Sequence, residues 1–133
     1  MRHKCVLCLG GTIDRMLFAD GLNHHLARHS ERVDLTGFET ADDVIVFMDA
    51  DGFPDLLVVH ADERDLEPAR RVVRFMDERA AALGSLVIHA LAPSSDLSTI
   101  ADGDAVVVID PSEGRERLCR VSFDALFRPP SFL

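Results

Sequence analysis

Hydrophobic and polar positions follow two different periods along the chain. Short and nearly continuous apolar runs are typical of strands that are buried on both faces of a parallel sheet. Such runs lie at residues 5–9, 56–59, 86–91 and 105–109, with a weaker one at 33–38. Apolar residues that recur at helical spacing predict helices between these runs. These segments lie at residues 14–29, 41–51 and 65–83. The alternation predicts β-α-β units and an α/β fold with a parallel sheet.

Residues with strong local preferences mark the ends of these elements. Thr40 is suited to cap the second helix and Gly52 to end it. Pro54 keeps the preceding residue out of the helical region, so the third strand is expected to begin soon after it. Asp65 is expected to cap the third helix, and Gly84 to end it.

The last part of the chain has a different pattern. Residues 110–114 have turn chemistry, and apolar and polar side chains then alternate over 118–123. We expect an antiparallel hairpin here, followed by at most a one-turn helix that starts at Ser122 or Asp124. Between the fourth and fifth strands, residues 95–101 leave room for at most two helical turns.

The composition fits one compact domain. The chain has 133 residues, of which 47% are hydrophobic and 28% are charged, so a core of useful size fits in a single domain. No apolar run reaches the roughly 18 residues that a membrane span requires, and we expect no membrane partner. The formal charge is −9, and Lys4 is the only lysine. A nucleic-acid backbone would repel such a chain, so we also expect no nucleic-acid partner.

The three cysteines give no sign of a redox or zinc site. Cys5 and Cys8 have C-x-x-C spacing, but side chains three apart on a strand face opposite sides of the sheet. The pair is therefore expected to be neither a redox pair nor half of a zinc site. With Cys119 they are interpreted as three reduced thiols. Residues 1–13 lack the cleavage site of a signal peptide, and we expect a cytoplasmic location.

One passage of the sequence carries a family resemblance. It consists of residues 38–43, an amphipathic helix, and residues 52–59, in which Pro54 and Asp55 precede four apolar residues. This passage resembles the segment from the second helix to the third strand of two-component receiver domains. The spacing of the predicted strands also fits, and the resemblance covers about residues 4–111.

The resemblance implies a fold and a domain organisation. The fold is a flavodoxin-like, doubly wound sheet of five parallel strands in the order 2-1-3-4-5, with functional positions at the carboxyl ends of the strands. The chain is interpreted as a single receiver-like domain over residues 1–133. Its core would cover 4–111, and the predicted hairpin and tail at 112–133 would replace the last helix of the family.

The sequence departs from the receiver pattern at the positions that carry the family's chemistry. Gly10 and Gly11 replace the acidic pair that holds Mg²⁺, and His60 replaces the phospho-accepting aspartate. The hydroxyl residue after the fourth strand falls on Leu91, and the lysine before a proline falls on Asp110. Aspartyl phosphorylation needs a carboxylate nucleophile beside a divalent cation. The resemblance therefore implies a degenerate phosphorylation pocket, with no metal and no other cofactor.

These departures predict a pseudo-receiver that is not an enzyme. Such a module would regulate signal transduction without being phosphorylated, by binding another signalling protein or a second copy of itself. The candidate partner surface combines the side of the fourth and fifth strands with the C-terminal tail. Phe127, Phe132 and Leu133 are its candidate residues, because little sequence is left to cover them in a monomer.

A phosphatase is the first alternative. The string that ends in Asp49, Ala50, Asp51 and Gly52 imitates the nucleophile motif of haloacid-dehalogenase-like phosphatases, in which a strand delivers two aspartates to Mg²⁺. Phe53 stands where that motif has a hydroxyl residue. The helical spacing of the preceding residues predicts instead that Asp49 and Asp51 end a helix.

Histidines suggest the second alternative, a ligand-sensing or acid-base site. His60 and His89 lie toward the ends of neighbouring predicted strands and are expected to approach each other in the degenerate pocket. His25 and His29 have the i, i+4 spacing that suits Zn²⁺. No third ligand accompanies that pair, so we interpret it as part of a solvated helix face.

Overall fold

A five-stranded parallel sheet forms the centre of the molecule. The computed structural model describes residues 3–61, 66–78, 85–90, 106–109 and 114–127. The strands are β1 Lys4–Leu9, β2 Val33–Phe38, β3 Leu56–Ala61, β4 Ser85–Ala90 and β5 Val106–Ile109. Their order in the sheet is β2-β1-β3-β4-β5, and each neighbouring pair is parallel. This is the strand order that the receiver resemblance implies.

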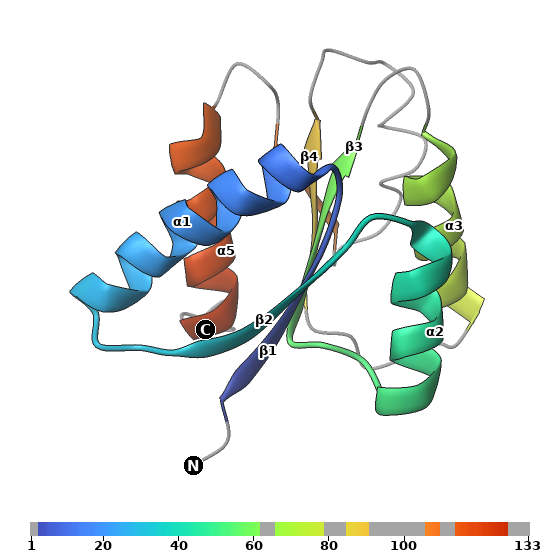
Figure 1. Ribbon diagram of the computed structural model, residues 1–133, viewed down its shortest axis with the longest axis horizontal. Coiled ribbons are helices and arrows are strands. Elements are labelled where there is room, and N and C mark those ends of the chain that lie inside the picture. Colours follow the sequence, from blue (N-terminus) through green and yellow to red (C-terminus); the bar gives the residue numbers. More distant parts are fainter. Residues whose placement is uncertain (1–2, 62–65, 79–84, 91–105, 110–113, 128–133) are drawn as a thin grey trace, which may run out of the picture.

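Helices cover both faces of the sheet. They are α1 Thr12–Arg28, α2 Ala41–Asp51, α3 Glu67–Glu78 and α5 Gly114–Phe127. Figure 1 shows α1 and α5 on one face and α2 and α3 on the other. Parallel strands need helical crossovers, and these crossovers bury the sheet on both sides.

Each face of the sheet has its own hydrophobic core. Val6 and Cys8 of β1 point toward α1 and α5, whereas Leu7 and Leu9 point toward α2 and α3. All four side chains are at most 2% exposed. Cys5 packs against the core beneath α2 and α3. Cys5 and Cys8 therefore lie on opposite faces, which confirms the prediction that they do not form a redox pair.

Local chemistry sets the ends of α2 as the sequence predicts. The Asp43 backbone N–H donates to the Thr40 hydroxyl oxygen over 3.2 Å, which confirms Thr40 as the N-cap. Gly52 ends the helix with a φ of +92°, a conformation that favours glycine. The Cys5 backbone N–H donates to the Asp55 carboxylate over 2.8 Å. This hydrogen bond links β1 to the residue that precedes β3.

The predicted C-terminal hairpin is wrong, because residues 114–127 form α5. The buried residues of this segment are Leu118, Cys119, Ser122, Phe123 and Leu126. They follow the spacing i, i+1, i+4, i+5, i+8 of a helix face, and over six residues this spacing also resembles the alternation of a strand. The face completes the core between α1 and the sheet. The last helix of the receiver fold is therefore retained.

Helices α1 and α5 pack at close range. A Cβ atom on Gly21 would lie 2.6 Å from the Cys119 Sγ, so only a glycine fits here without a shift. The Cys119 thiol also lies 3.9 Å from the Phe18 carbonyl oxygen, to which it donates a hydrogen bond. Gly21 thus allows the contact between the two helices although it weakens the helical propensity of α1.

Some predicted features lie outside the residues that the structure describes. They are the helix caps Asp65 and Gly84 and the short helix at 95–101.

Candidate functional site

The first and third strands bring the degenerate positions together. Leu9 of β1 is paired in register with Val59 of β3, so Gly10 and His60 come next at the carboxyl edge of the sheet. A Cβ atom on Gly10 would lie 2.9 Å from both the Cβ and the Cδ2 of His60. Gly10 and His60 are therefore direct neighbours at this edge of the sheet.

His60 is buried at this edge. Its side chain is on the α1 side of the sheet and the residue is 8% exposed. The imidazole lies edge-on against the Phe18 ring, with 6.1 Å between the ring centroids and 69° between the planes. Where a receiver has an acidic side chain above β1 and an aspartate on β3, this chain has a bare glycine backbone with an imidazole packed over it.

The strand register also pairs His60 with His89. The expected approach of the two histidine positions is confirmed at the level of the backbone. Leu91 and Asp110, the other two positions of the degenerate pocket, lie outside the described ranges.

Gly11 forms the boundary between the site and the first helix. It is the N-cap residue of α1, with a φ of −65° and no side-chain cap. The nearest atom to a Cβ on Gly11 would be an Asp14 carboxylate oxygen at 3.7 Å. Asp14 is the acidic residue of the first turn, where a negative charge suits the helix dipole.

A polar cluster that sequence reasoning missed lies beside the glycines. The Arg15 guanidinium donates to the Thr12 hydroxyl over 3.2 Å and pairs with the Glu39 carboxylate at 3.3 Å. The Arg15 side chain is only 21% exposed and lies over Gly37, where a Cβ would be 2.8 Å from its Nη1. Thr12 and Arg15 have the i, i+3 spacing of one helix face. Glu39 comes from a loop far along the chain, so no local signal could include it.

The candidate metal ligands among the described residues do not gather into one cluster. Within the described ranges, no three His, Cys, Asp or Glu side chains are grouped so as to hold a metal ion. His25 and His29 both face the Phe123 ring of α5, with centroids 6.3 and 4.6 Å from it. Their i, i+4 spacing thus serves ring contacts between α1 and α5.

Asp49 and Asp51 do not form a phosphatase site. Both lie in α2, and both are exposed. The prediction that they end a helix is confirmed. A haloacid-dehalogenase nucleophile must project from the end of a buried strand, so the phosphatase alternative is wrong for these residues.

Burial makes the two core thiols poor nucleophiles. Burial raises the pKa of Cys8 to about 12 and the pKa of Cys119 to about 11. The thiolate is the reactive form of cysteine, so neither group is suited to catalysis near neutral pH.

Exposed apolar side chains gather on the first two turns of α1. Ile13 is 73% exposed, Met16 is 66% exposed and Leu17 is 39% exposed. We call these three residues the α1 stripe. Their spacing of three and four residues places them on one side of the helix, directly after the glycines of the site.

The predicted tail surface is described only at its beginning. Phe127 is half-buried and packs on Phe123, with 5.0 Å between the ring centroids. Phe132 and Leu133 lie outside the part of the chain that the structure describes.

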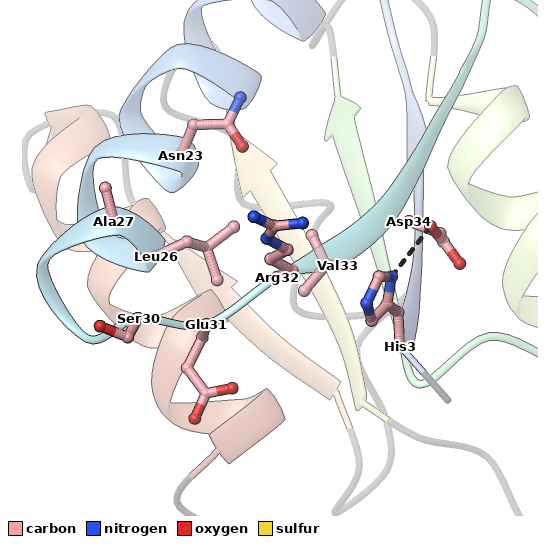
Figure 2. Close-up of a pocket in the computed structure, with 9 residues that line it drawn as sticks. All are labelled: His3, Asn23, Leu26, Ala27, Ser30, Glu31, Arg32, Val33 and Asp34. Carbon is pink, nitrogen blue, oxygen red and sulfur yellow. Dashed lines mark ion pairs between the residues drawn. The ribbon is translucent and has the colours of Figure 1, made fainter. Parts of the chain in front are cut away.

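A hollow of about 610 Å³ lies at the other end of α1. Figure 2 shows that it is lined by the end of α1, the following loop and the start of β2, with His3 and Asp34 paired at 3.6 Å. It lies by the amino ends of β1 and β2, away from Gly10 and His60. The degenerate pocket and this hollow are therefore separate features.

Comparisons with known proteins agree with this architecture. No protein-family model matches the sequence, and no curated protein is significantly similar to it. Solved structures of receiver domains do resemble it. One is the signal receiver domain of a Vibrio parahaemolyticus protein described as a Luxo repressor, with a TM-score of 0.71 and 20% identity, covering 96% of this chain and 92% of that chain.

Two further solved structures also resemble this chain in fold. The chemotaxis protein CheY4 of Vibrio cholerae has a TM-score of 0.69 and 10% identity, covering 94% of this chain and 100% of that chain. A DNA-binding response regulator of the LuxR family from Staphylococcus aureus has a TM-score of 0.65 and 11% identity, covering 92% of this chain and 98% of that chain. The chain thus has a receiver-like fold. No helix among its described residues is long and apolar enough to cross a membrane.

Proposed function

We propose that this chain is a pseudo-receiver, a signalling module that regulates a partner by binding it and does not accept phosphate. The observation that carries the proposal is the contact between Gly10 and His60. The fold is that of a receiver, but an imidazole packs against a glycine where the phosphorylation chemistry of receivers would be placed.

The chemistry of phosphoryl transfer explains why this contact matters. An aspartyl phosphate forms when a carboxylate attacks phosphorus while Mg²⁺ neutralises the phosphoryl oxygens. Mg²⁺ is held by oxygen ligands. Gly10 and Gly11 offer no side-chain oxygen at the positions of the acidic pair, and His60 offers nitrogen at the position of the acceptor.

Binding to another protein is the function that a receiver-like fold can serve without that chemistry. The α1 stripe supports this proposal, because exposed apolar side chains that lie together are typical of interaction surfaces. The tail residues Phe127, Phe132 and Leu133 are proposed as a second part of the partner surface. The proposed partner is another signalling protein or a second copy of the chain, and the proposed location is the cytoplasm.

Phosphate uptake tests the proposal. The purified chain is incubated with acetyl phosphate and Mg²⁺, and its intact mass is measured beside a functional receiver domain treated in the same way. The receiver is expected to gain about 80 Da, the mass of one phosphoryl group, and this chain is expected to gain nothing. A stoichiometric adduct on this chain would overturn the pseudo-receiver proposal.

A further inference from the structure

A second surface feature, distinct from the α1 stripe, combines apolar and acidic side chains. It is a hollow of about 580 Å³ between the end of β2 and the outer side of α2. The position of these two elements is visible in Figure 1. We call it the acidic groove, and the residues that define it are Phe38, Glu39, Asp43, Val46, Phe47 and Asp51.

The floor of the groove is apolar. The Phe38 and Phe47 rings lie 5.4 Å apart and are half-buried, so they form an aromatic wall at the end of β2. Val46 is 66% exposed, although its neighbour Phe47 packs inward. An exposed valine beside two aromatic rings offers a contact for one apolar side chain of a partner.

The described residues that line the groove carry more negative than positive charge, with three carboxylates and one arginine. Arg15 is the one basic residue that lines it, and Arg15 already pairs with Glu39 at 3.3 Å. Neither Asp43 nor Asp51 forms an ion pair with another described residue. Two carboxylates of the groove therefore have no ion-pair partner among the described residues, and of the two only Asp43 lies at the end of α2 where the helix dipole favours negative charge.

Asp51 is placed at the less favourable end of its helix. It lies in the last turn of α2, where the helix dipole repels negative charge, and no basic residue occupies that turn. A cation from outside would relieve this repulsion, which is an independent sign that the groove suits a basic ligand.

Two other hollows among the described residues carry less excess negative charge. The hollow of Figure 2 has Arg32 beside Glu31, and His3 pairs with Asp34 there. The groove between α1 and α5 balances two acidic residues with two arginines, namely Asp20 and Glu116 with Arg28 and Arg115. Charge complementarity thus singles out the acidic groove among these three hollows.

β2, the strand beside the acidic groove, can align a peptide through its backbone donors and acceptors. β2 is at the edge of the sheet, and among the described strands it pairs only with β1. An edge strand presents backbone donors and acceptors to an extended segment, and neighbouring pockets then select its side chains.

We propose that the acidic groove binds an extended peptide segment of a partner protein, in which arginine or lysine residues flank an apolar residue. The basic side chains would pair with Asp43 and Asp51, and the apolar one would lie against Val46 and the aromatic wall. This inference rests on the proposed function, because it specifies which kind of partner segment the proposed binding module would recognise.

Fluorescence anisotropy with a labelled peptide of alternating arginine and leucine tests the inference. The wild-type chain is expected to bind this peptide and to bind a glutamate-leucine peptide of the same length far more weakly. The double variant Asp43→Asn/Asp51→Asn is expected to weaken binding about tenfold or more. The matched control Asp20→Asn/Glu31→Gln removes the same charge from other exposed sites and is expected to change binding less than about twofold.

A substitution of Val46 distinguishes peptide binding in the acidic groove from non-specific attraction of a basic peptide to an acidic chain. Val46→Lys changes an exposed side chain and is expected to abolish binding while the thermal unfolding midpoint stays nearly unchanged. The inference is overturned if wild type does not bind the arginine-leucine peptide, or if the two double variants lose affinity equally. Phosphate uptake by the wild type would overturn the proposed function alone, because the groove does not include Gly10 or His60.

Discussion

Adding one methyl group at Gly10 tests the packing of the degenerate site. In Gly10→Ala, the new Cβ would lie 2.9 Å from the Cβ and Cδ2 of His60 and 3.2 Å from its Cγ. The His60 Cβ is fixed by the backbone of β3, so a rotation of the ring cannot relieve every contact. The substitution is therefore expected to overpack the edge between β1 and β3.

The size of the effect follows from two opposing contributions. Overpacking of a well-packed site costs about 1–3 kcal/mol. Replacing glycine by alanine restricts the unfolded chain, and this raises the free energy of unfolding by about 0.4–1 kcal/mol where the backbone conformation is compatible. We expect Gly10→Ala to lower the free energy of unfolding by about 1–2 kcal/mol. In urea denaturation this corresponds to a midpoint lower by about 1 M, since m values of small domains are about 1–3 kcal/mol/M.

A double-mutant cycle identifies His60 as the cause. His60→Ala removes the Cδ2 and Cγ atoms and leaves the Cβ, so the penalty of Gly10→Ala is expected to become smaller in that background without vanishing. Gly11→Ala is the matched control, because its Cβ would have no neighbour closer than 3.7 Å. That control is expected to change stability by no more than about 0.5 kcal/mol. An equal penalty for Gly10→Ala with and without the imidazole would refute the reasoning.

Three further predictions concern other parts of the molecule. Gly21→Ala is expected to destabilise the chain by about 1–3 kcal/mol, because its Cβ would meet the Cys119 Sγ at 2.6 Å, and Cys119→Ala should restore part of the loss in thermal unfolding. Asp51→Asn is expected to raise the free energy of unfolding by about 0.3–1 kcal/mol, because it removes a negative charge from the end of α2; a lower value in urea denaturation would contradict this. Burial raises the pKa of Cys8 from 9.0 to about 12, so the contribution of this thiol to stability is expected to be fully present below pH 9 and to be lost as the pH rises toward 12; Cys8→Ala should reduce the fall in stability over that range.

Much of the fold could be predicted from local patterns. The continuous apolar strands, the Thr40 cap and Gly52 each act within a few residues, and the structure confirms them. The receiver resemblance implies that Gly10 and His60 lie close together, and the register of β1 and β3 places both at the carboxyl edge of the parallel sheet.

The features that the sequence did not reveal depend on tertiary contacts. The alternation over residues 118–123 predicts a hairpin where the structure has a helix, because the buried face is short and includes Ser122, a polar residue that is nevertheless fully buried. The close contact of Gly21 with Cys119 joins residues far apart in the chain. The same holds for the pairing of Arg15 with Glu39. Sequence periodicity contains no information about such partners.

Nuclear magnetic resonance of the glycine amides tests the central claim most directly. Amide spectra of the labelled chain are recorded during titration with Mg²⁺ and fluoroberyllate, a mimic of the phosphoryl group, and during a control titration with NaCl at the same ionic strength. If the pocket neither holds the metal nor accepts phosphate, the Gly10, Gly11 and Thr12 signals will move only as they do in NaCl. Saturable shifts of these signals with Mg²⁺ and fluoroberyllate would contradict the account.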